Sequence, residues 1–220
     1  MKKLMSVFTV LIFHYLLLEA SEVSYAVQKI SQEVQFVKKY FKDSDEDFLK
    51  ALATMNYVVG HVSAPNYAYL RDSVGVSHEV EDVLKNEAGI CRSAQDAFMA
   101  IAEGLGLQMR NMYIWYSKSD KKERAGHATV EVFYKGKWHW FDPTWGTFYR
   151  FPNAQPDEVL CFRQIISLEK KNRKKCAISY CSLLWRQTVS TWSDDVDDYM
   201  EYKNLTVQID SYTGPIIYQR

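Results

Sequence analysis

One stretch of the sequence predicts two strands and the turn between them. The chain reads GHATVEVFY at residues 126–134, KG at residues 135–136 and KWHWFDPT at residues 137–144. The even positions of the first segment are apolar, and alternate residues of a strand share one face. Lys135 and Gly136 fit a two-residue hairpin loop. We therefore predict an antiparallel hairpin with strands at 128–134 and 138–141, with Val130 and Val132 on the core face.

The length of this loop fixes which residues lie opposite each other. With a two-residue loop Thr129 pairs with Asp142, and paired residues share a face. His127 lies two positions from Thr129, so it shares that face with Asp142, at roughly 7–8 Å between backbones. Trp138 and Trp140 would lie on the same face. A loop with an odd number of residues would instead place His127 and Asp142 on opposite faces.

A cysteine upstream of the hairpin stands at the start of a predicted helix. The chain reads EAGICRSA at residues 87–94, and Gly89 suits a tight turn before the helix. Apolar residues then recur at helical spacing at Ala94, Phe98, Ile101 and Leu105. Cys91 would lie in the first turn, where free N–H groups and the helix dipole favour a thiolate. We expect the helix to end at Gly104 or Gly106.

These residues supply the groups that acyl transfer through a thioester requires, namely a thiol, an imidazole and a carboxylate. Cys91 would be the nucleophile and His127 its base. Asp142 would orient the imidazole and stabilise the imidazolium that forms when it takes the thiol proton. Taken singly, each residue has an ordinary structural alternative. Cys91 could be a core residue, His127 a histidine at a strand end and Asp142 a turn residue. Their order and shared geometry favour the catalytic interpretation.

The same residues could in principle bind zinc. Cys91 and His127 would then need a third ligand, such as His61, His78 or His139. The sequence has neither the Cys-x-x-Cys nor the His-Glu-x-x-His spacing of common zinc sites. We therefore predict no metal and no other cofactor.

Three segments of the chain together resemble the transglutaminase-like superfamily. They are residues 89–91, 126–132 and 136–144, within a region of resemblance that spans roughly residues 87–148. The resemblance implies an α+β, papain-like fold with N-terminal helices and an antiparallel sheet. It also implies a cysteine peptidase, amidase or acyltransferase that acts on a protein or peptide substrate, with Cys91, His127 and Asp142 as its catalytic residues.

The resemblance leaves the oxyanion-stabilising side chain unassigned. In the family it usually precedes the cysteine; Tyr67 and Tyr69 are candidates, and the backbone N–H of Cys91 would contribute as well. No calcium loop is evident, and the chain is short for a calcium-activated crosslinking enzyme. We expect hydrolysis rather than transfer to an amine. The alternative is a non-catalytic module on the same fold that binds a peptide or a glycan.

Further elements are predicted on both sides of this region. We predict helices at 24–41, from 44 to 60, and at 77–86 with Ser77 as the cap. Strands are predicted at 109–116, 205–209 and 216–218, and exposed charged segments at 118–124, 169–175 and 194–201.

The first 20 residues form a separate segment. Residues 1–3 are a basic start, residues 4–18 are almost entirely apolar, and a small residue precedes Ser21. This layout predicts a signal peptide at 1–20, with an uncleaved anchor as the alternative. The protein would be secreted or located in the periplasm or cell envelope. A transglutaminase-like domain would follow at 21–150, with a C-terminal extension at 151–220 packed on it.

The composition of the chain limits the kinds of partner that we expect. Its 220 residues are 47% hydrophobic, and 27 basic residues balance 27 acidic residues. A neutral chain of this kind does not favour nucleic acid as a partner. Contact with a membrane is expected only if the N-terminal segment is not cleaved. With Cys91 as a working thiol, an exported chain could form one disulfide among Cys161, Cys176 and Cys181 and leave the third unpaired; the sequence does not determine which two pair.

Overall fold

The computed structural model describes residues 21–39, 41–62, 77–117, 124–179, 206–211 and 214–219. The predicted signal peptide, the segment at 194–201, Tyr67, Tyr69 and Cys181 lie outside these residues. None of the helices in the described part of the chain combines the length and the apolar character needed to cross a membrane.

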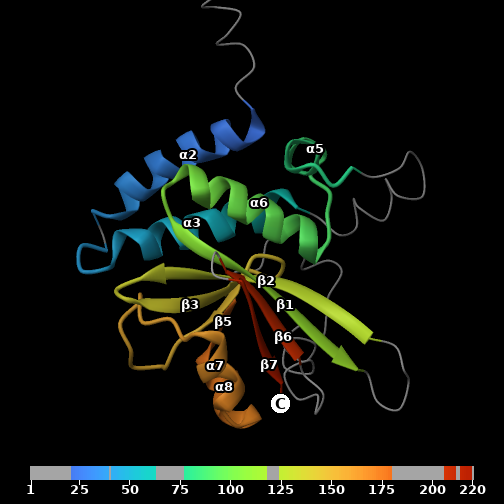
Figure 1. Ribbon diagram of the computed structural model, residues 1–220. Coiled ribbons are helices and arrows are strands. Elements are labelled where there is room, and N and C mark those ends of the chain that lie inside the picture. The colour runs from blue at the N-terminus through green and yellow to red at the C-terminus, as the bar shows by residue number, and fades with distance from the viewer. Residues whose placement is uncertain are drawn as a thin grey trace, which may run out of the picture.

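Helices and strands form separate layers, as the α+β prediction requires (Figure 1). The helices are α2 (Glu22–Val37), α3 (Glu46–His61), α5 (Val80–Asn86), α6 (Cys91–Gly104), α7 (Phe162–Ser167) and α8 (Lys170–Cys176). The strands are β1 (Gln108–Ser117), β2 (Arg124–Tyr134), β3 (Lys137–Asp142), β4 (Thr147–Tyr149), β5 (Ala177–Ser179), β6 (Thr206–Ser211) and β7 (Gly214–Gln219). They form one antiparallel sheet in the order β5-β4-β3-β2-β1-β6-β7. The predicted closing strands near the C-terminus are β6 and β7.

Local signals in the sequence place the start of α3 correctly and the start of α5 incorrectly, whereas α5 ends at Asn86 as predicted. The side chain of Asp45 accepts hydrogen bonds from the N–H groups of Asp47 and Phe48, which makes Asp45 the N-cap of α3. Ser77, predicted as the cap of the next helix, accepts instead from the N–H of Glu79. This local turn uses the hydroxyl before the helix begins, so α5 starts three residues later than predicted.

The hairpin has the predicted even register. Tyr134 lies opposite Lys137, and the pairing continues to Val130 opposite Phe141. Lys135 and Gly136 both have positive φ, at 47° and 72°, which is the backbone of a type I′ turn. The twist of this turn matches that of the strands, so the loop holds the register that the apolar pattern favours.

Both faces of the central strands are buried, each in its own core. The even residues of β2, including Val130 and Val132, pack with α2, α3 and α6. The opposite face packs against the C-terminal segment, in a second core of Met112, Ile114, Trp140, Tyr149, Leu160, Phe162, Ile165 and Cys176. Figure 1 shows α2, α3 and α6 on one side of the sheet and α7 and α8 on the other. The Asp142 side of the hairpin is therefore shielded from water.

The segment at 169–175 is less exposed than its charge suggested. Most of it forms α8, and Arg173 within this helix is fully buried, with its guanidinium donating to the carbonyl of Leu168 at 3.0 Å. The prediction of a solvated surface is wrong at this residue because the helix packs against the second core and the chain supplies a carbonyl partner for the buried cation.

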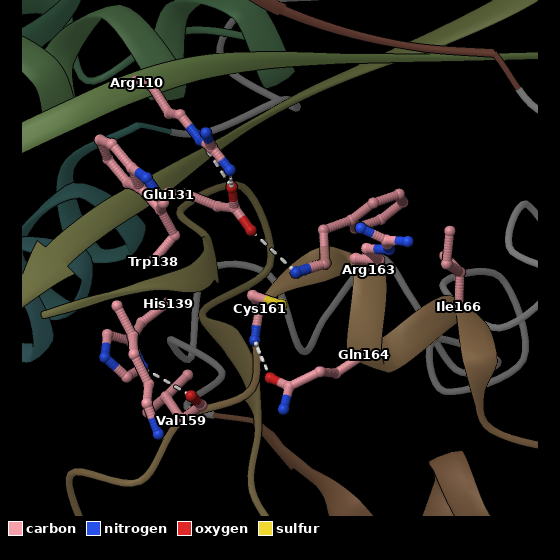
Figure 2. Close-up of a pocket in the computed structure, with 11 residues that line it drawn as sticks. Arg110, Glu131, Trp138, His139, Val159, Cys161, Arg163, Gln164 and Ile166 are labelled. Atoms are coloured by element: carbon pink, nitrogen blue, oxygen red, sulfur yellow. Dashed lines mark hydrogen bonds and ion pairs between the residues drawn. The ribbon is translucent and has the colours of Figure 1, made fainter. Parts of the chain in front are cut away.

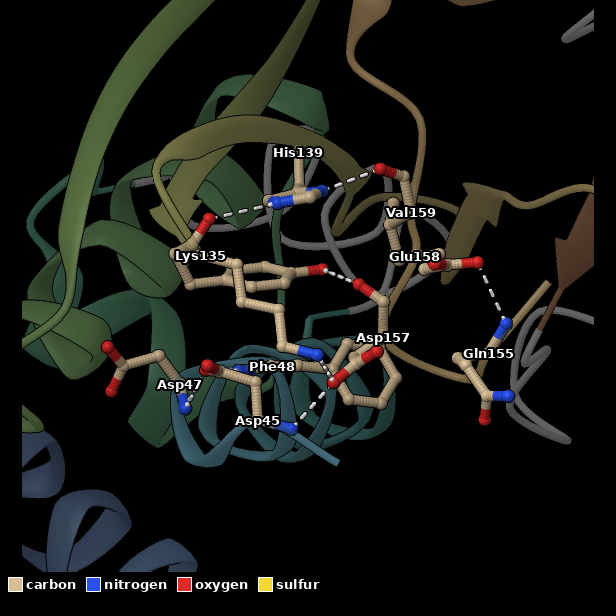
Figure 3. Close-up of polar contacts among 10 residues, drawn as sticks. Asp45, Asp47, Phe48, Lys135, His139, Gln155, Asp157, Glu158 and Val159 are labelled. Atoms are coloured by element: carbon tan, nitrogen blue, oxygen red, sulfur yellow. Dashed lines mark hydrogen bonds and ion pairs between the residues drawn. The ribbon is translucent and has the colours of Figure 1, made fainter. Parts of the chain in front are cut away.

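A buried carboxylate ties the hairpin turn to the helical layer (Figure 3). Asp157 accepts from the backbone N–H of Asp45 at 2.7 Å and from the ammonium of Lys135 at 2.5 Å. The phenol of Tyr134 donates to the carbonyl of Asp157 at 3.1 Å. Burial raises the pKa of Asp157, but the bonds from Lys135 and Asp45 lower it by more. The ionised carboxylate therefore fixes the turn of the hairpin against the start of α3.

Candidate active site

The first residue of α6 is Cys91, as predicted, and its thiol is half-buried. The N-cap residue Ile90 makes no capping bond through its side chain, so the first-turn N–H groups remain available to stabilise negative charge. Glycine is required at position 89 because of close packing, whereas we expected it to be required for a tight turn. Its φ is not left-handed, but a Cβ there would lie 2.5 Å from Cβ of Ser93 and 2.7 Å from Cγ1 of Val62. Only glycine allows this close packing before the cysteine.

His127 and Asp142 face each other across the hairpin. The distance between Nε2 of His127 and Oδ2 of Asp142 is 2.7 Å. Asp142 is fully buried, and its other oxygen accepts from the N–H groups of Thr144 at 3.0 Å and Trp145 at 3.4 Å. Each carboxylate oxygen has its own donors, so the side chain is fixed and its charge is directed at the imidazole.

His127 also interacts with Cys91, and the pKa values of the two groups move in opposite directions. Burial raises the pKa of the Cys91 thiol, but the hydrogen bond and charge of His127 and the N–H of Ala128 lower it by more. Burial lowers the pKa of His127, but the charge of Asp142 and hydrogen bonds to Asp142 and Cys91 raise it to about 10. Because Nε2 faces Asp142, Nδ1 is the nitrogen left for the thiol. Both shifts favour the pair of a thiolate and an imidazolium over the neutral thiol and imidazole.

Gln95 holds the cysteine helix against the strand that carries His127. Its side-chain amide is buried and donates to the carbonyls of Met112 on β1, at 3.1 Å, and Thr129 on β2, at 2.5 Å. The hydroxyl of Thr129 accepts in turn from the indole of Trp140 on β3 at 3.0 Å. Gln95 was not among the site residues predicted from the sequence. A polar residue one turn after the cysteine, among apolar positions of α6, was the available signal.

The thiol opens into a cleft of about 350 Å³ between α6 and the ends of β1 and β2. The cleft is lined by Cys91, Arg92, Tyr113, Trp115, Gly126, His127 and Ala128. Tyr113 and Trp115, the aromatic residues of β1 in this lining, were also not identified from the sequence, because a strand rich in aromatics is equally typical of a core. The proposed oxyanion candidates Tyr67 and Tyr69 lie outside the described residues.

A second cavity, of about 430 Å³, lies between β3 and α7, and none of the three predicted site residues lines it (Figure 2). Its wall contains an ion pair in which Arg110 bonds to the buried carboxylate of Glu131 at 2.5 Å and lies over the Trp138 ring. The other oxygen of Glu131 accepts from the N–H of Phe162 at 2.8 Å. These contacts attach the start of α7 to β2.

The histidines considered as further zinc ligands have other partners in the described structure. His139 contacts the carbonyls of Val159 at 2.6 Å and Tyr134 at 3.1 Å through its two ring nitrogens. His61 contacts the carbonyl of Tyr57 at 2.8 Å. Among the residues that the structure describes, no group of three histidine, cysteine or acidic side chains is arranged to hold a metal ion. Cys161 and Cys176 are free thiols.

A comparison with protein families gives a match to the model of the transglutaminase-like superfamily over residues 34–143, which is half of the chain. The matched region begins within α2 and ends just after β3, so it contains Cys91, His127 and Asp142. No curated protein matches the chain.

Proposed function

Because the chain belongs to the transglutaminase-like superfamily, we propose that it is a cysteine enzyme that cleaves an amide bond in a protein or peptide. Cys91 is the nucleophile, His127 the acid and base, and Asp142 the residue that orients His127. The observation that carries this proposal is the position of His127, which bonds to the buried Asp142 at 2.7 Å and also interacts with the Cys91 thiol. A binding module would not need this chain of charge-assisted contacts.

In the first half of the proposed reaction, the Cys91 thiolate attacks the carbonyl carbon and a C–S bond forms. The C–N bond then breaks, and the proton on Nδ1 of His127 passes to the leaving amine. The product is a thioester on Cys91 and a neutral imidazole. The backbone N–H of Cys91, at the start of α6, would donate to the oxyanion that develops.

In the second half, water resolves the thioester. His127 takes a proton from the water while the oxygen of the water bonds to the acyl carbon. The C–S bond then breaks, which restores the thiolate of Cys91 beside the imidazolium of His127. Transfer to an amine would follow the same course with nitrogen in place of oxygen. Among the described residues that line the cleft there is no carboxylate to hold an incoming ammonium group, and this favours hydrolysis.

The reaction of Cys91 with iodoacetamide, measured against pH, tests this proposal. The wild-type rate should rise through an inflection below the roughly 8.5 of a free thiol, because His127 stabilises the thiolate. His127→Ala should raise the inflection toward that ordinary value or above it, since the effect of burial on Cys91 is then opposed only by the N–H of Ala128. Both proteins should carry Cys161→Ser, which removes the other half-buried thiol of the described residues, and mass spectrometry should identify the alkylated residue.

Equal inflections at the ordinary thiol value in the two proteins would reject the catalytic proposal. The non-catalytic module that binds a peptide or glycan would then be the better account of this fold.

We also propose that the protein is exported, on the basis of the basic start and the apolar run at residues 4–18. N-terminal sequencing of the protein from the secreted or envelope fraction should give a chain that begins near Ser21. An intact Met1 on a soluble cytoplasmic protein would contradict this proposal, and an intact Met1 in a membrane fraction would indicate an anchor.

A further inference from the structure

Two aromatic side chains form one wall of the thiol cleft. Tyr113 and Trp115 lie two residues apart on β1, so they share a face of the strand. Tyr113 lies opposite Ala128, and Trp115 lies opposite Gly126. Each large ring is therefore paired with a very small residue of β2, on the two sides of His127. This pairing leaves room for the rings along the strand that carries the proposed base.

The contact between Trp115 and Gly126 is close. A Cβ on Gly126 would lie 2.7 Å from Cζ3 and 2.9 Å from Cε3 of the indole. The six-membered part of the ring therefore rests against the backbone of β2, one residue before His127. Glycine at 126 allows this position, and any other residue would displace the ring.

Within this wall Trp115 is exposed and Tyr113 is half-buried, whereas the aromatic residues of the two cores are buried. Trp115 is 42% exposed, and Ile90, which directly precedes Cys91, is 38% exposed. Both belong to a small group of large apolar residues that remain open to solvent in the described structure. Exposed apolar surface at a concave site is typical of a surface that binds a ligand.

The charged groups at the cleft are already paired. Arg92 bonds to Asp96 at 2.7 Å, and its guanidinium lies 5.2 Å from the centre of the Tyr113 ring. His127 is paired with Asp142 and Cys91. No carboxylate is present among the described lining residues, so a lysine or arginine side chain of a substrate would find no counter-ion there.

We propose that Tyr113 and Trp115 select substrates with a large aromatic or aliphatic side chain on the acyl side of the scissile amide. This inference rests on the proposed function, and it adds the class of acyl group that Cys91 would accept. The side chain would pack on the indole next to the reacting carbonyl. In an apolar pocket, one extra or missing methylene group changes relative rates by about 10–200-fold.

A set of four peptidyl acyloxymethyl ketones tests the proposal. The probes differ only in the side chain next to the ketone, which is that of phenylalanine, leucine, glutamine or lysine. The thiolate of Cys91 displaces the carboxylate of the probe and forms a stable C–S bond. In the wild type, the phenylalanine and leucine probes should label Cys91 at least about tenfold faster than the other two.

Variants of the wall assign the selectivity to Trp115. Trp115→Ala should reduce the preference for phenylalanine over glutamine to less than about threefold, whereas Trp115→Phe should keep most of it. Gly126→Ala leaves Trp115 in the chain but displaces its indole, so it should also weaken the preference for phenylalanine over glutamine. Phe151→Ala is the matched control, because Phe151 is equally exposed but does not line the cleft, and it should keep the wild-type preference.

Iodoacetamide is too small to need the aromatic wall, so it separates the two proposals. Equal labelling by all four probes, or an unchanged preference in Trp115→Ala, would overturn the selectivity. If the pH dependence of iodoacetamide alkylation is intact in the same proteins, the proposed function stands. If the wild type also lacks the lowered thiol inflection, both proposals fail.

Discussion

Replacement of Cys91 by serine should lower the rate of amide hydrolysis by a factor on the order of 10⁴ to 10⁶. Serine is nearly isosteric, so it should leave α6 in place. Its hydroxyl is far less acidic than the thiol, and the surroundings of Cys91 stabilise a thiolate, through His127 and the N–H of Ala128. A serine at this position would have to be deprotonated by a histidine whose pKa the charge and hydrogen bond of Asp142 still raise, so that it tends to hold a proton already.

The measurement is kcat/KM on a fluorogenic peptide amide, with circular dichroism to confirm that the fold is retained. Cys161→Ser is the matched control, because Cys161 is also a half-buried free thiol at the start of a helix, and it should keep the wild-type rate. Retention of wild-type hydrolysis by Cys91→Ser would exclude Cys91 as the nucleophile.

Replacement of Asp142 by asparagine should lower kcat/KM by about 10²–10⁴-fold. One oxygen of the carboxylate accepts from Thr144 and Trp145, and the other faces Nε2 of His127. An amide has only one oxygen. If it serves the backbone donors, its NH₂ group faces Nε2 and opposes the imidazolium. The pKa of His127 should therefore fall, and the inflection for alkylation of Cys91 should rise.

Asp157→Asn provides the control for stability in this experiment. Asp157 is also a buried carboxylate that accepts from a backbone N–H group, but it lies at the turn of the hairpin, away from the cleft. The Asp157→Asn substitution should lower the melting temperature and leave the inflection in the pH dependence of Cys91 alkylation unchanged. If Asp142→Asn loses stability and leaves the inflection unchanged, Asp142 has only a structural role.

The pairing of His127 with Asp142 was predictable because it depends on short-range rules. A two-residue loop that contains glycine sets an even register, and a register with period two determines which residues share a face. The start of α6 at Cys91 followed in the same way from the apolar spacing after Gly89. These features depend on residues close together in the sequence, and the structure has them as predicted.

Features that depend on contacts between distant segments were not predictable. The role of Gln95 requires two strand carbonyls, of Met112 and Thr129, to meet one helix position. The need for glycine at 89 comes in part from Val62, the C-cap residue of a different helix. Trp115 lines its cleft together with the first residues of α6, which are distant from it in the sequence. From the sequence alone, such residues cannot be told apart from ordinary core or surface residues.

The second core has a consequence for how the chain can be divided. The region that the family model matches ends at Pro143, whereas the partners of Trp140 on the Asp142 side of the hairpin include Leu160, Phe162 and Ile165. A fragment that stopped at residue 143 would expose that indole and remove the N–H group that Glu131 binds. The smallest autonomous unit therefore extends at least through α7, and its boundary is set by the covering of the second face of the sheet rather than by the limits of the shared motif.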